Sequence, residues 1–450
     1  MSCEVGWIGQ RSWAYCSARH RLMRIYLQSR ARKVLLLGAS LTLAAAYTGL
    51  AGARFVAAFL SQRGDLASLQ RATHVDPQDA EYHYLLGRYF WLVQRDPDLA
   101  VPAFRAAVAL NPYAAPYWFD LAAAYELMGY YTQGETDALE HAIQADPTTP
   151  SIAWEAANFY IVQGNTRDAL KEFRVVLAND PDLIIAALDK CWRIEPDVDA
   201  LLRDVLPPMS TVNSSFLKFL LSKNEMVAAS KVWAQMTRLN QPVEKSYVFD
   251  YIRSLILAGD VDKARLVWHQ SATLSALTSY QPTPSNLVVN GDFGMDVLNG
   301  GFDWTYIPST QVSLELDPTQ NHDGTRSLLI NFDARSIEDV GIRQLIPVQP
   351  NTSYEFSAYF KVEDLAGAGG PRFLFQDLYD GTTYFASEDL KDAAFWKQVD
   401  GFFVTGLKTK MLVLRVQRFP AGPIKGKLWI DGIRLVQKAP EPKAPKDSSS

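Results

Sequence analysis

The side chains that most often support catalysis or hold a metal are scattered along this chain. They include six histidines (His20, His74, His83, His141, His269 and His322) and three cysteines (Cys3, Cys16 and Cys191). None falls at a metal-ligand spacing, and the chain has no G-x-S-x-G elbow, H-E-x-x-H motif, P-loop or dinucleotide-binding glycine run. Carboxylates are plentiful, but a glycosidase pair leaves no local pattern. We therefore expect no enzyme, no catalytic residue and no cofactor.

Length and charge limit the classes of protein that remain. A chain of 450 residues is too long for one core and indicates several domains. The formal net charge is −5, and no basic face is visible after residue 60. Nucleic-acid binding is therefore not expected, because it relies on a basic surface.

The N-terminal region differs from the rest of the chain. Residues 1–33 carry six arginines and Lys33 against one acid, Glu4, and residues 34–53 form an uncharged run of 20 residues. Such a run spans about 30 Å as a helix, which matches the hydrocarbon core of a bilayer. The basic flank predicts a cytoplasmic N-terminus in the inner membrane, with the bulk of the chain periplasmic or otherwise extracytoplasmic. A cleaved leader ending near Ala53 and a soluble helix are the alternatives.

A proline returns at a nearly constant interval after this segment. The positions are Pro77, Pro112, Pro147 and Pro181, at intervals of 35, 35 and 34 residues. Small residues recur in the first helix of each unit (Gly87, Ala122 and Ala157), and Ala–Phe pairs four residues apart mark the second helix (Ala100 with Phe104, Ala169 with Phe173). A period near 34 residues with helical patterning predicts a helical solenoid, with the Asp or Asn before each proline favouring a turn.

These residues resemble the tetratricopeptide repeat family, whose pattern is W-x2-L-G-x2-Y, then A-x3-F, then A and P. The middle repeat departs from it, with Glu135 and Leu139 at the small and aromatic positions. The resemblance implies a concave groove that holds a protein partner. Carried over by position, the groove residues are Tyr84, Arg88, Trp91, Phe119, Trp154 and Asn158, with packing between repeats as the alternative role of the aromatics.

The helical pattern continues less regularly to residue 280. "NEMVAASKVWAQM" and "GDVDKARLVWHQS" match each other, with Ala229 and Ala264, and Trp233 and Trp268, both 35 residues apart. We predict degenerate helical repeats over 182–280, followed by a proline-containing linker.

Alternation of apolar and polar residues replaces the helical period after the linker. In "TSYEFSAYFKV" every second residue from Tyr354 to Val362 is apolar, and "RSLLINF" and "MLVLRVQ" repeat the pattern. Such runs, separated by turn sequences, predict an antiparallel sandwich. In "KLWIDGIRLV" the phase slips at Asp431-Gly432, which predicts a β-bulge.

The order "NLVVNGDF", Trp304, "DGTRSLLI", "IRQLIPVQPNTSYEFSAYFK", "FWKQVDGFFVT" and "GKLWIDGIRLV" resembles the galactose-binding-like jelly-roll modules grouped with carbohydrate-binding module families four, nine and twenty-two. The resemblance implies a glycan or polysaccharide partner, held by aromatic rings and polar side chains. The residues expected to bind the glycan are Tyr359, Gln376, Tyr379, Tyr384, Arg415 and Gln417. The alternative is that they are ordinary exposed strand and loop residues.

Many members of this group also hold a structural calcium ion. The chain keeps Asp292 and Asp431, but it has Gly294 and Gly432 where further acids are common. Calcium needs several oxygen ligands, so this departure counts against a calcium site.

The sequence therefore predicts a multidomain chain with a transmembrane helix, an all-α tetratricopeptide-type solenoid and a C-terminal all-β jelly-roll sandwich. The expected segments are 1–33 (basic, cytoplasmic), 34–60 (anchor or signal), 61–181 (repeats), 182–280 (degenerate repeats), 281–285 (linker), 286–437 (sandwich) and 438–450 (disordered tail). The expected function is a membrane-anchored scaffold with a glycan-binding module in envelope or exopolysaccharide assembly or export. A structural envelope protein that binds no sugar, and a carbohydrate-active enzyme with an unrecognised site, are the alternatives.

Overall fold

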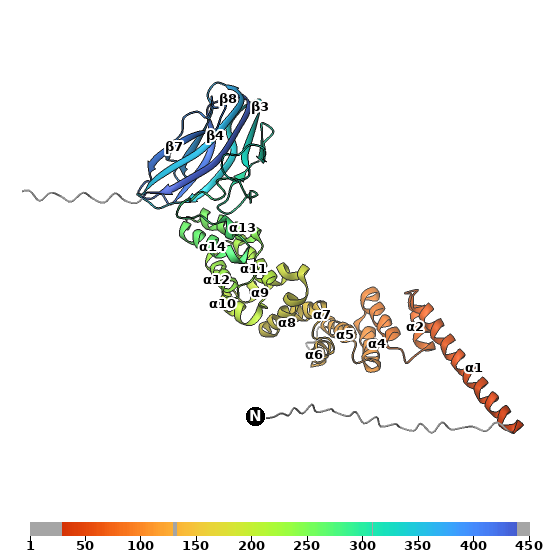
Figure 1. The fold of residues 1–450 in the computed structure, drawn as a ribbon. Coiled ribbons are helices and arrows are strands. Elements are labelled where there is room, and N and C mark those ends of the chain that lie inside the picture. The colour runs from red at the N-terminus through yellow and green to blue at the C-terminus, as the bar shows by residue number, and fades with distance from the viewer. Residues whose placement is uncertain (1–28, 129–132, 308, 439–450) are drawn as a thin grey trace, which may run out of the picture. The chain divides into compact units, whose positions relative to one another are not determined.

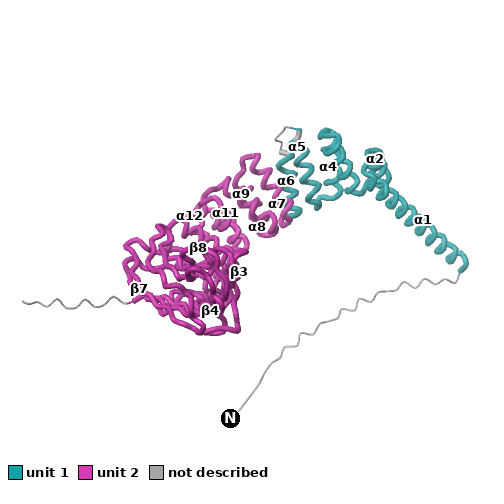
Figure 2. The backbone as a smooth tube through the Cα atoms, turned by 90° about the horizontal axis from the view of Figure 1, so that it is seen from above, with its two compact units in different colours: residues 1–146 teal, residues 147–450 magenta. Residues whose placement is uncertain are grey.

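The computed structural model describes residues 29–128, 133–307 and 309–438 (Figure 1). The predicted cytoplasmic segment up to residue 28 and the predicted tail from residue 439 lie outside these residues. The chain divides into two compact units, Met1–Asp146 and Pro147–Ser450 (Figure 2).

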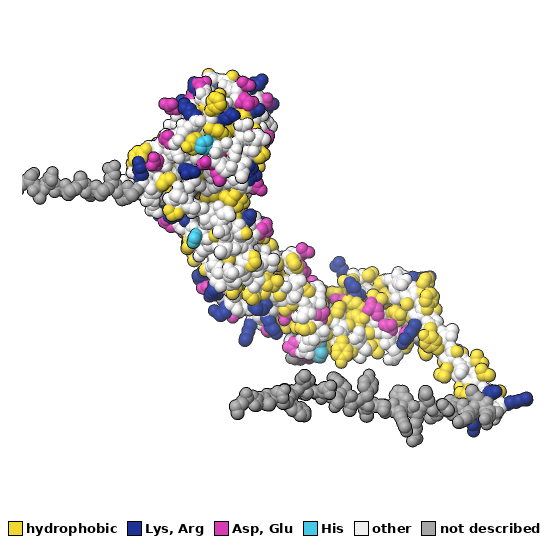
Figure 3. Space-filling view, viewed as in Figure 1, with side chains coloured by type: hydrophobic (Ala, Val, Ile, Leu, Met, Phe, Trp, Pro, Cys, Tyr) yellow, Lys and Arg dark blue, Asp and Glu magenta, His cyan; other side chains and the backbone are white. Residues whose placement is uncertain are grey.

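The first helix of the first unit, α1 (Arg30–Ser61), is 32 residues long. It is long and apolar enough to cross a membrane, with a mean hydropathy of 1.8 over its most apolar window and none of that window buried. Figure 3 shows hydrophobic side chains gathered along this helix. Only its C-terminal end joins a core, where Ala57 packs with Ala72 and Tyr82. The predicted apolar helix is therefore present.

The helices that follow α1 in the first unit pack against their neighbours in the chain. They are α2 (Leu66–Val75), α3 (Ala80–Arg88) with the π-helical turn η1 (Tyr89–Gln94), α4 (Pro97–Leu110), α5 (Ala115–Leu127) and α6 (Gln133–Ala145). Helix α2 packs on α1, α3 on α4 and α5 on α6. Gly87 lies against Phe104, and a Cβ atom at Gly87 would come within 2.6 Å of that ring. This close approach is the physical reason for the small residue that recurs in the repeat.

The second unit continues the helical pairs and then becomes all β. Its helices are α7 (Pro150–Val162), α8 (Thr166–Asn179), η2 (Pro181–Leu183), α9 (Ile184–Ile194), α10 (Val198–Ala200), η3 (Leu201–Val205), α11 (Ser210–Ser222), α12 (Met226–Arg238), α13 (Lys245–Leu257), α14 (Val261–Leu274) and η4 (Thr278–Tyr280). Asp180 Oδ1 accepts the backbone N–H of Asp182 at 3.0 Å, which confirms the turn expected before the last repeat proline. Ala229, Trp233, Ala264 and Trp268 are all buried in one helical core.

Within the described residues the sandwich has eight strands, all paired antiparallel. They are β1 (Thr305–Tyr306), β2 (Val312–Asp317), β3 (Ser327–Pro347), β4 (Ser353–Gly367), β5 (Pro371–Asp377), β6 (Thr383–Ala386), β7 (Lys397–Val404) and β8 (Met411–Gln437). The two long strands, β3 and β8, take part in both layers. One layer contains β2, the start of β3, the end of β8, β4 and β7. The other contains β1, the end of β3, the start of β8, β5 and β6.

The core between the two layers combines aliphatic side chains with a group of packed aromatic rings. Phe356 on β4 lies against Phe373 and Phe375 on β5, with ring centroids 5.3 and 5.0 Å apart. Tyr354, Phe356, Ala358 and Phe360 are buried, as the alternation predicts. The β4–β8 register shifts between Ser357, which is opposite Arg434, and Tyr359, which is opposite Asp431. Strand β8 therefore has one extra residue next to Asp431-Gly432, and the predicted bulge is confirmed.

Candidate functional site

The six residues expected to bind a glycan lie in four places on the sandwich. Gln376, Arg415 and Gln417 share one face of the paired strands β5 and β8, and we call them the β5–β8 cluster. In this ladder Gln376 is opposite Val413, Leu374 is opposite Arg415 and Arg372 is opposite Gln417. Their side chains point away from the core, on the outer face of the layer that contains β5. All three side chains are partly exposed. This cluster is the part of the predicted set that the fold brings together.

An aspartate on β3 links two members of this cluster. Gln417 Nε2 donates to Asp339 Oδ2 at 3.1 Å, and Arg415 Nη1 lies 3.7 Å from the same oxygen. Arg343 is directly opposite Arg415 in the β3–β8 ladder, and Arg415 Nε is buried without a hydrogen-bond partner. Like charges directly opposite each other in a sheet are unfavourable. The outer face therefore carries more positive charge than Asp339 can balance.

Tyr359 and Tyr384 lie away from this cluster. Tyr359 is on β4 in the other layer, where its ring stacks on His322 with centroids 3.5 Å apart and its hydroxyl donates to Gln398 at 3.0 Å. Tyr384 packs against Phe403 at the edge of the core. The role predicted for these two tyrosines in glycan binding stays a prediction.

Tyr379 lies where the sandwich meets the last helical hairpin. Its hydroxyl donates to the backbone carbonyl oxygen of Ile256 on α13 at 2.9 Å. Lys410, just before β8, forms an ion pair with Asp262 on α14 at 2.7 Å. Both contacts join segments more than one hundred residues apart in sequence. They show that α13, α14 and the sandwich pack together within the second unit.

The centre of this junction is the loop "NGGFDW", Asn299–Trp304. Gly300 lies against Phe249 and Gly301 against Trp268, so closely that a Cβ atom would fall 2.3 and 2.1 Å from those rings. Phe302 is 2% exposed and lies edge-on to Trp268 at 5.8 Å. Burial of such a ring contributes about 2 kcal/mol. The loop is therefore a wedge that joins the helical core to the sandwich.

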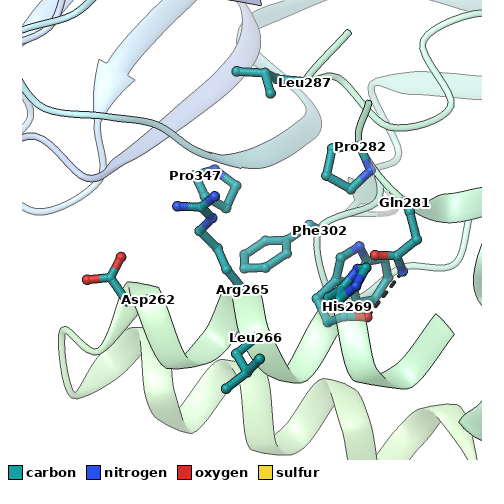
Figure 4. Close-up of a pocket in the computed structure, with 10 residues that line it drawn as sticks. Asp262, Arg265, Leu266, His269, Gln281, Pro282, Leu287, Phe302 and Pro347 are labelled. Atoms are coloured by element: carbon teal, nitrogen blue, oxygen red, sulfur yellow. Dashed lines mark hydrogen bonds between the residues drawn. The ribbon is translucent and has the colours of Figure 1, made fainter. Parts of the chain in front are cut away.

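A pocket opens on the α14 side of the wedge. It has a volume of about 360 Å³ and lies between α14 and the sandwich, with Phe302 in its wall. Figure 4 shows Arg265 extending from α14 toward Pro347, and Gln281 donating to the carbonyl oxygen of Trp268 at 3.1 Å. Gln281 and its neighbours belong to the predicted linker, and this hydrogen bond ties its first residue to α14.

A second pocket opens on the α13 side of the wedge. It has a volume of about 470 Å³ and is lined by Ile256, Leu345, Arg343 and Asp303, among others. Asp303 is 0% exposed. One of its carboxylate oxygens accepts the backbone N–H of Leu298 at 2.7 Å, and the other has no hydrogen-bond partner. Burial raises the pKa of Asp303 to about 7, so this side chain can carry a proton near neutral pH.

The residues expected to line a protein-binding groove fall in both units. In the first, Arg88 lies 3.6 Å from Asp120 and the ring of Tyr84 lies 4.3 Å from that of Tyr117. Trp91 lies edge-on to Phe104, and Phe119 is half-buried on α5. In the second unit, the ring of Trp154 lies against Phe173, and Asn158 Nδ2 donates to the carbonyl oxygen of Trp154. Most of these side chains thus take part in packing, and their binding role stays a prediction.

The two carboxylates considered for a structural calcium ion, Asp292 and Asp431, both accept backbone hydrogen bonds, and Asp292 Oδ1 accepts the N–H of Gly294 at 3.2 Å. Asp431 accepts the backbone N–H groups of His322, Asp323 and Gly432. Asp323 in turn is paired with Arg434 at 3.1 Å. Within the described ranges, no group of three or more His, Cys, Asp or Glu side chains is arranged to hold a metal ion. The hydrogen bonds of Asp431 thus give this carboxylate a structural role in joining the His322 turn to β8.

Two regions of the chain match known family models. Residues 285–421 match the model described as Carbohydrate binding domain, and residues 66–115 and 92–150 match the model described as Tetratricopeptide repeat. The chain therefore combines a tetratricopeptide-repeat region with a C-terminal domain of the carbohydrate-binding class, and both resemblances predicted from the sequence are confirmed. Domains of these two classes bind and do not catalyse, which supports a glycan-binding interaction module.

Solved structures of both kinds are similar to parts of the chain. One described as "CBM4 structure and function" is 14% identical, with 34% of this chain and 99% of that one covered and a TM-score of 0.26. The CBM22-1 xylan-binding domain from Paenibacillus barcinonensis Xyn10C is 18% identical, with 33% and 94% covered and a TM-score of 0.24. Pseudomonas aeruginosa pilF is 20% identical, with 50% and 93% covered and a TM-score of 0.26. At these low TM-scores, none of the three contributes to the assignment of function. Comparison with curated proteins finds no match.

Proposed function

We propose that this chain is a membrane-anchored, non-cytoplasmic interaction protein whose sandwich binds a glycan, and that it acts in envelope or exopolysaccharide assembly or export. The observation that carries the proposal is the cluster of Gln376, Arg415 and Gln417 on the outer face of a domain that matches the carbohydrate-binding model. Amide and guanidinium groups on a rigid sheet suit sugar hydroxyls, because their donors and acceptors are held in fixed positions.

The glycan-binding part is tested on the full chain in detergent micelles, with immobilised neutral and acidic polysaccharides. Loss of one hydrogen-bonding side chain should weaken binding about fivefold, which corresponds to about 1 kcal/mol. Gln376→Ala should have this effect, and Gln311→Ala, an exposed residue just before β2, should not. If the folded chain binds no polysaccharide, the structural envelope role replaces this proposal. Release of reducing sugar from a bound polysaccharide would instead favour an enzyme.

The membrane part rests on α1 and on the basic residues that precede its apolar run. The charge asymmetry supports an N-terminus in the cytoplasm. A reporter active only outside the cytoplasm, fused after residue 65, should therefore be active. Activity of a cytoplasmic reporter at the same position would contradict the proposed topology.

The scaffolding part assigns a protein partner to the repeats. A photo-crosslinking residue in place of Phe119 should capture a discrete protein in cells. The same residue in place of Tyr113, which is 84% exposed in the preceding turn, is the matched control. Equal capture at both positions would contradict a specific surface on α5.

A further inference from the structure

The pocket on the α13 side of the wedge is formed jointly by the helical repeats and the sandwich. Helix α13 supplies an apolar wall that includes Ile252 and Ile256, and the sandwich faces it with Leu345 and Tyr379. Because Tyr379 is fixed by its hydrogen bond to the backbone of α13, its ring is held in place. An apolar wall of this kind suits the CH groups on one face of a sugar ring.

The charged side chains that line the pocket are two arginines and one aspartate. Arg343 is exposed and makes no ion pair or side-chain hydrogen bond with any residue in the described ranges. Arg253 is 3.8 Å from Asp250 and its side chain is 69% exposed. The pocket therefore offers a guanidinium group that the protein itself does not neutralise, next to the further positive charge of Arg415 across the ladder.

Asp303 is a polar residue in the wall of the same pocket. Asp303 is fully buried, and one of its carboxylate oxygens has no hydrogen-bond partner. A buried polar atom left without a partner costs about 1 to 3 kcal/mol. A ligand group that forms a hydrogen bond with this oxygen recovers that cost. The pocket thus calls for a ligand with both an anionic group and a hydroxyl.

We propose that this pocket binds a uronic acid residue of an acidic glycan. The sugar carboxylate pairs with the Arg343 guanidinium, whose planar fork matches a carboxylate. A sugar hydroxyl forms a hydrogen bond with Asp303, and the apolar face of the ring lies against the wall that includes Ile256 and Leu345. This inference rests on the proposed function and adds to it the chemical class of the glycan and the contribution of α13 to its site.

The test compares two hexasaccharides that differ only in the group at carbon six. The probes are the hexamer of β-1,4-linked glucuronic acid and cellohexaose, titrated into the full chain in detergent micelles. The wild type should bind the acidic hexamer about tenfold more tightly than the neutral one, as a charge-assisted hydrogen bond provides. Arg343→Gln should remove most of this preference. Arg335→Gln, at a side chain on the same strand that is 56% exposed, should preserve it.

A second pair of variants separates binding from folding. Leu257 lines the pocket and is 81% exposed, so Leu257→Glu and Leu257→Gln should both fold. The glutamate should weaken binding of the acidic hexamer about tenfold relative to the glutamine by repulsion. Equal binding of the two hexamers by the wild type, or equal effects of Leu257→Glu and Leu257→Gln, would overturn the uronic acid assignment. If the neutral hexamer still bound in that case, the proposed glycan-binding function would stand. Binding of no glycan at all would overturn both.

Discussion

The hydroxyl of Tyr379, on the turn after β5, donates to the backbone carbonyl oxygen of Ile256 near the end of α13, 2.9 Å away. Tyr379 is half exposed, and the sequence alone places it in a turn with no indication of a distant partner. Its position is instead fixed by a helix that precedes it by 123 residues. The contact shows that α13 packs against the end of the sandwich that carries Tyr379.

Tyr379→Phe should lower the free energy of unfolding of the second unit by about 1 kcal/mol, because it removes one hydrogen bond and leaves the ring. Chemical denaturation followed by tryptophan fluorescence measures this change. Tyr306→Phe, at an exposed tyrosine on the short strand β1, should leave the free energy unchanged. Equal effects of the two substitutions would show that the bond to α13 does not stabilise the fold.

Gly301→Ala should be far more damaging than the same change at Gly381. Both glycines have positive φ, 64° and 74°, which costs an alanine about 1 kcal/mol or more. Only at Gly301 would the new Cβ lie against Trp268, at 2.1 Å, since Gly381 has nothing within 4 Å.

Overpacking adds about 1 to 3 kcal/mol, so Gly301→Ala should destabilise by about 2 to 4 kcal/mol and Gly381→Ala by about 1 kcal/mol. Protease sensitivity near residues 281–285 should rise only in the Gly301 variant. If both variants resist protease alike, the wedge does not hold the sandwich to the helices.

Asp303 should make the second unit less stable as the pH rises. Its pKa is raised from 3.8 to about 7 by burial, so the folded state binds the proton more tightly than the unfolded state does. Between about pH 4 and pH 7 this side chain should therefore lower the free energy of unfolding by about 1.4 kcal/mol for each pH unit.

Asp303→Asn should remove this contribution, because the amide is neutral and its oxygen can still accept the N–H of Leu298. The free energy of the variant relative to wild type, measured by denaturation from pH 4 to pH 8, should rise by roughly 4 kcal/mol across the interval. Asp333→Asn, at a side chain that is 77% exposed, is the control. A difference between variant and wild type that does not change with pH would contradict the assigned proton.

Gly87→Ala should destabilise the first unit. The added methyl group would meet the ring of Phe104 at 2.6 Å, and overpacking of this kind costs about 1 to 3 kcal/mol. Hydrogen exchange of the amides in α3 and α4 measures the loss of protection. Gly49→Ala, in α1 with nothing within 4 Å, should leave this protection unchanged, and protection preserved in both variants would contradict tight packing at Gly87.

Most of the architecture could be predicted because each helix and strand has its own local sequence periodicity. The spacing of small residues against aromatics at Gly87 and Phe104 gives the hairpins, and the alternation around Phe356 gives the sandwich faces. The slip at Asp431-Gly432 gives even the bulge. Each signal lies within a few residues of the element that it predicts.

The pocket beside α13 could not be predicted in this way. Arg343, Asp303 and Ile256 meet only because the wedge brings two domains together, and no local period records that contact. Of the predicted glycan-binding residues, Gln376, Arg415 and Gln417 come together because they share a ladder, whereas Tyr359 lies on the other layer. The paired glycines before Phe302 were the available signal, since adjacent glycines followed by an aromatic residue mark a close approach of the backbone.

The wedge also has a mechanical consequence. Phe302 is buried in the helical core and Gln281 is hydrogen-bonded to α14. These two contacts restrict rotation of the sandwich relative to the last helical hairpin. The orientation of a polymer bound to the β5–β8 face would therefore be set by α13 and α14. A force on that polymer would be transmitted to these helices as torque and would not be absorbed by a flexible linker.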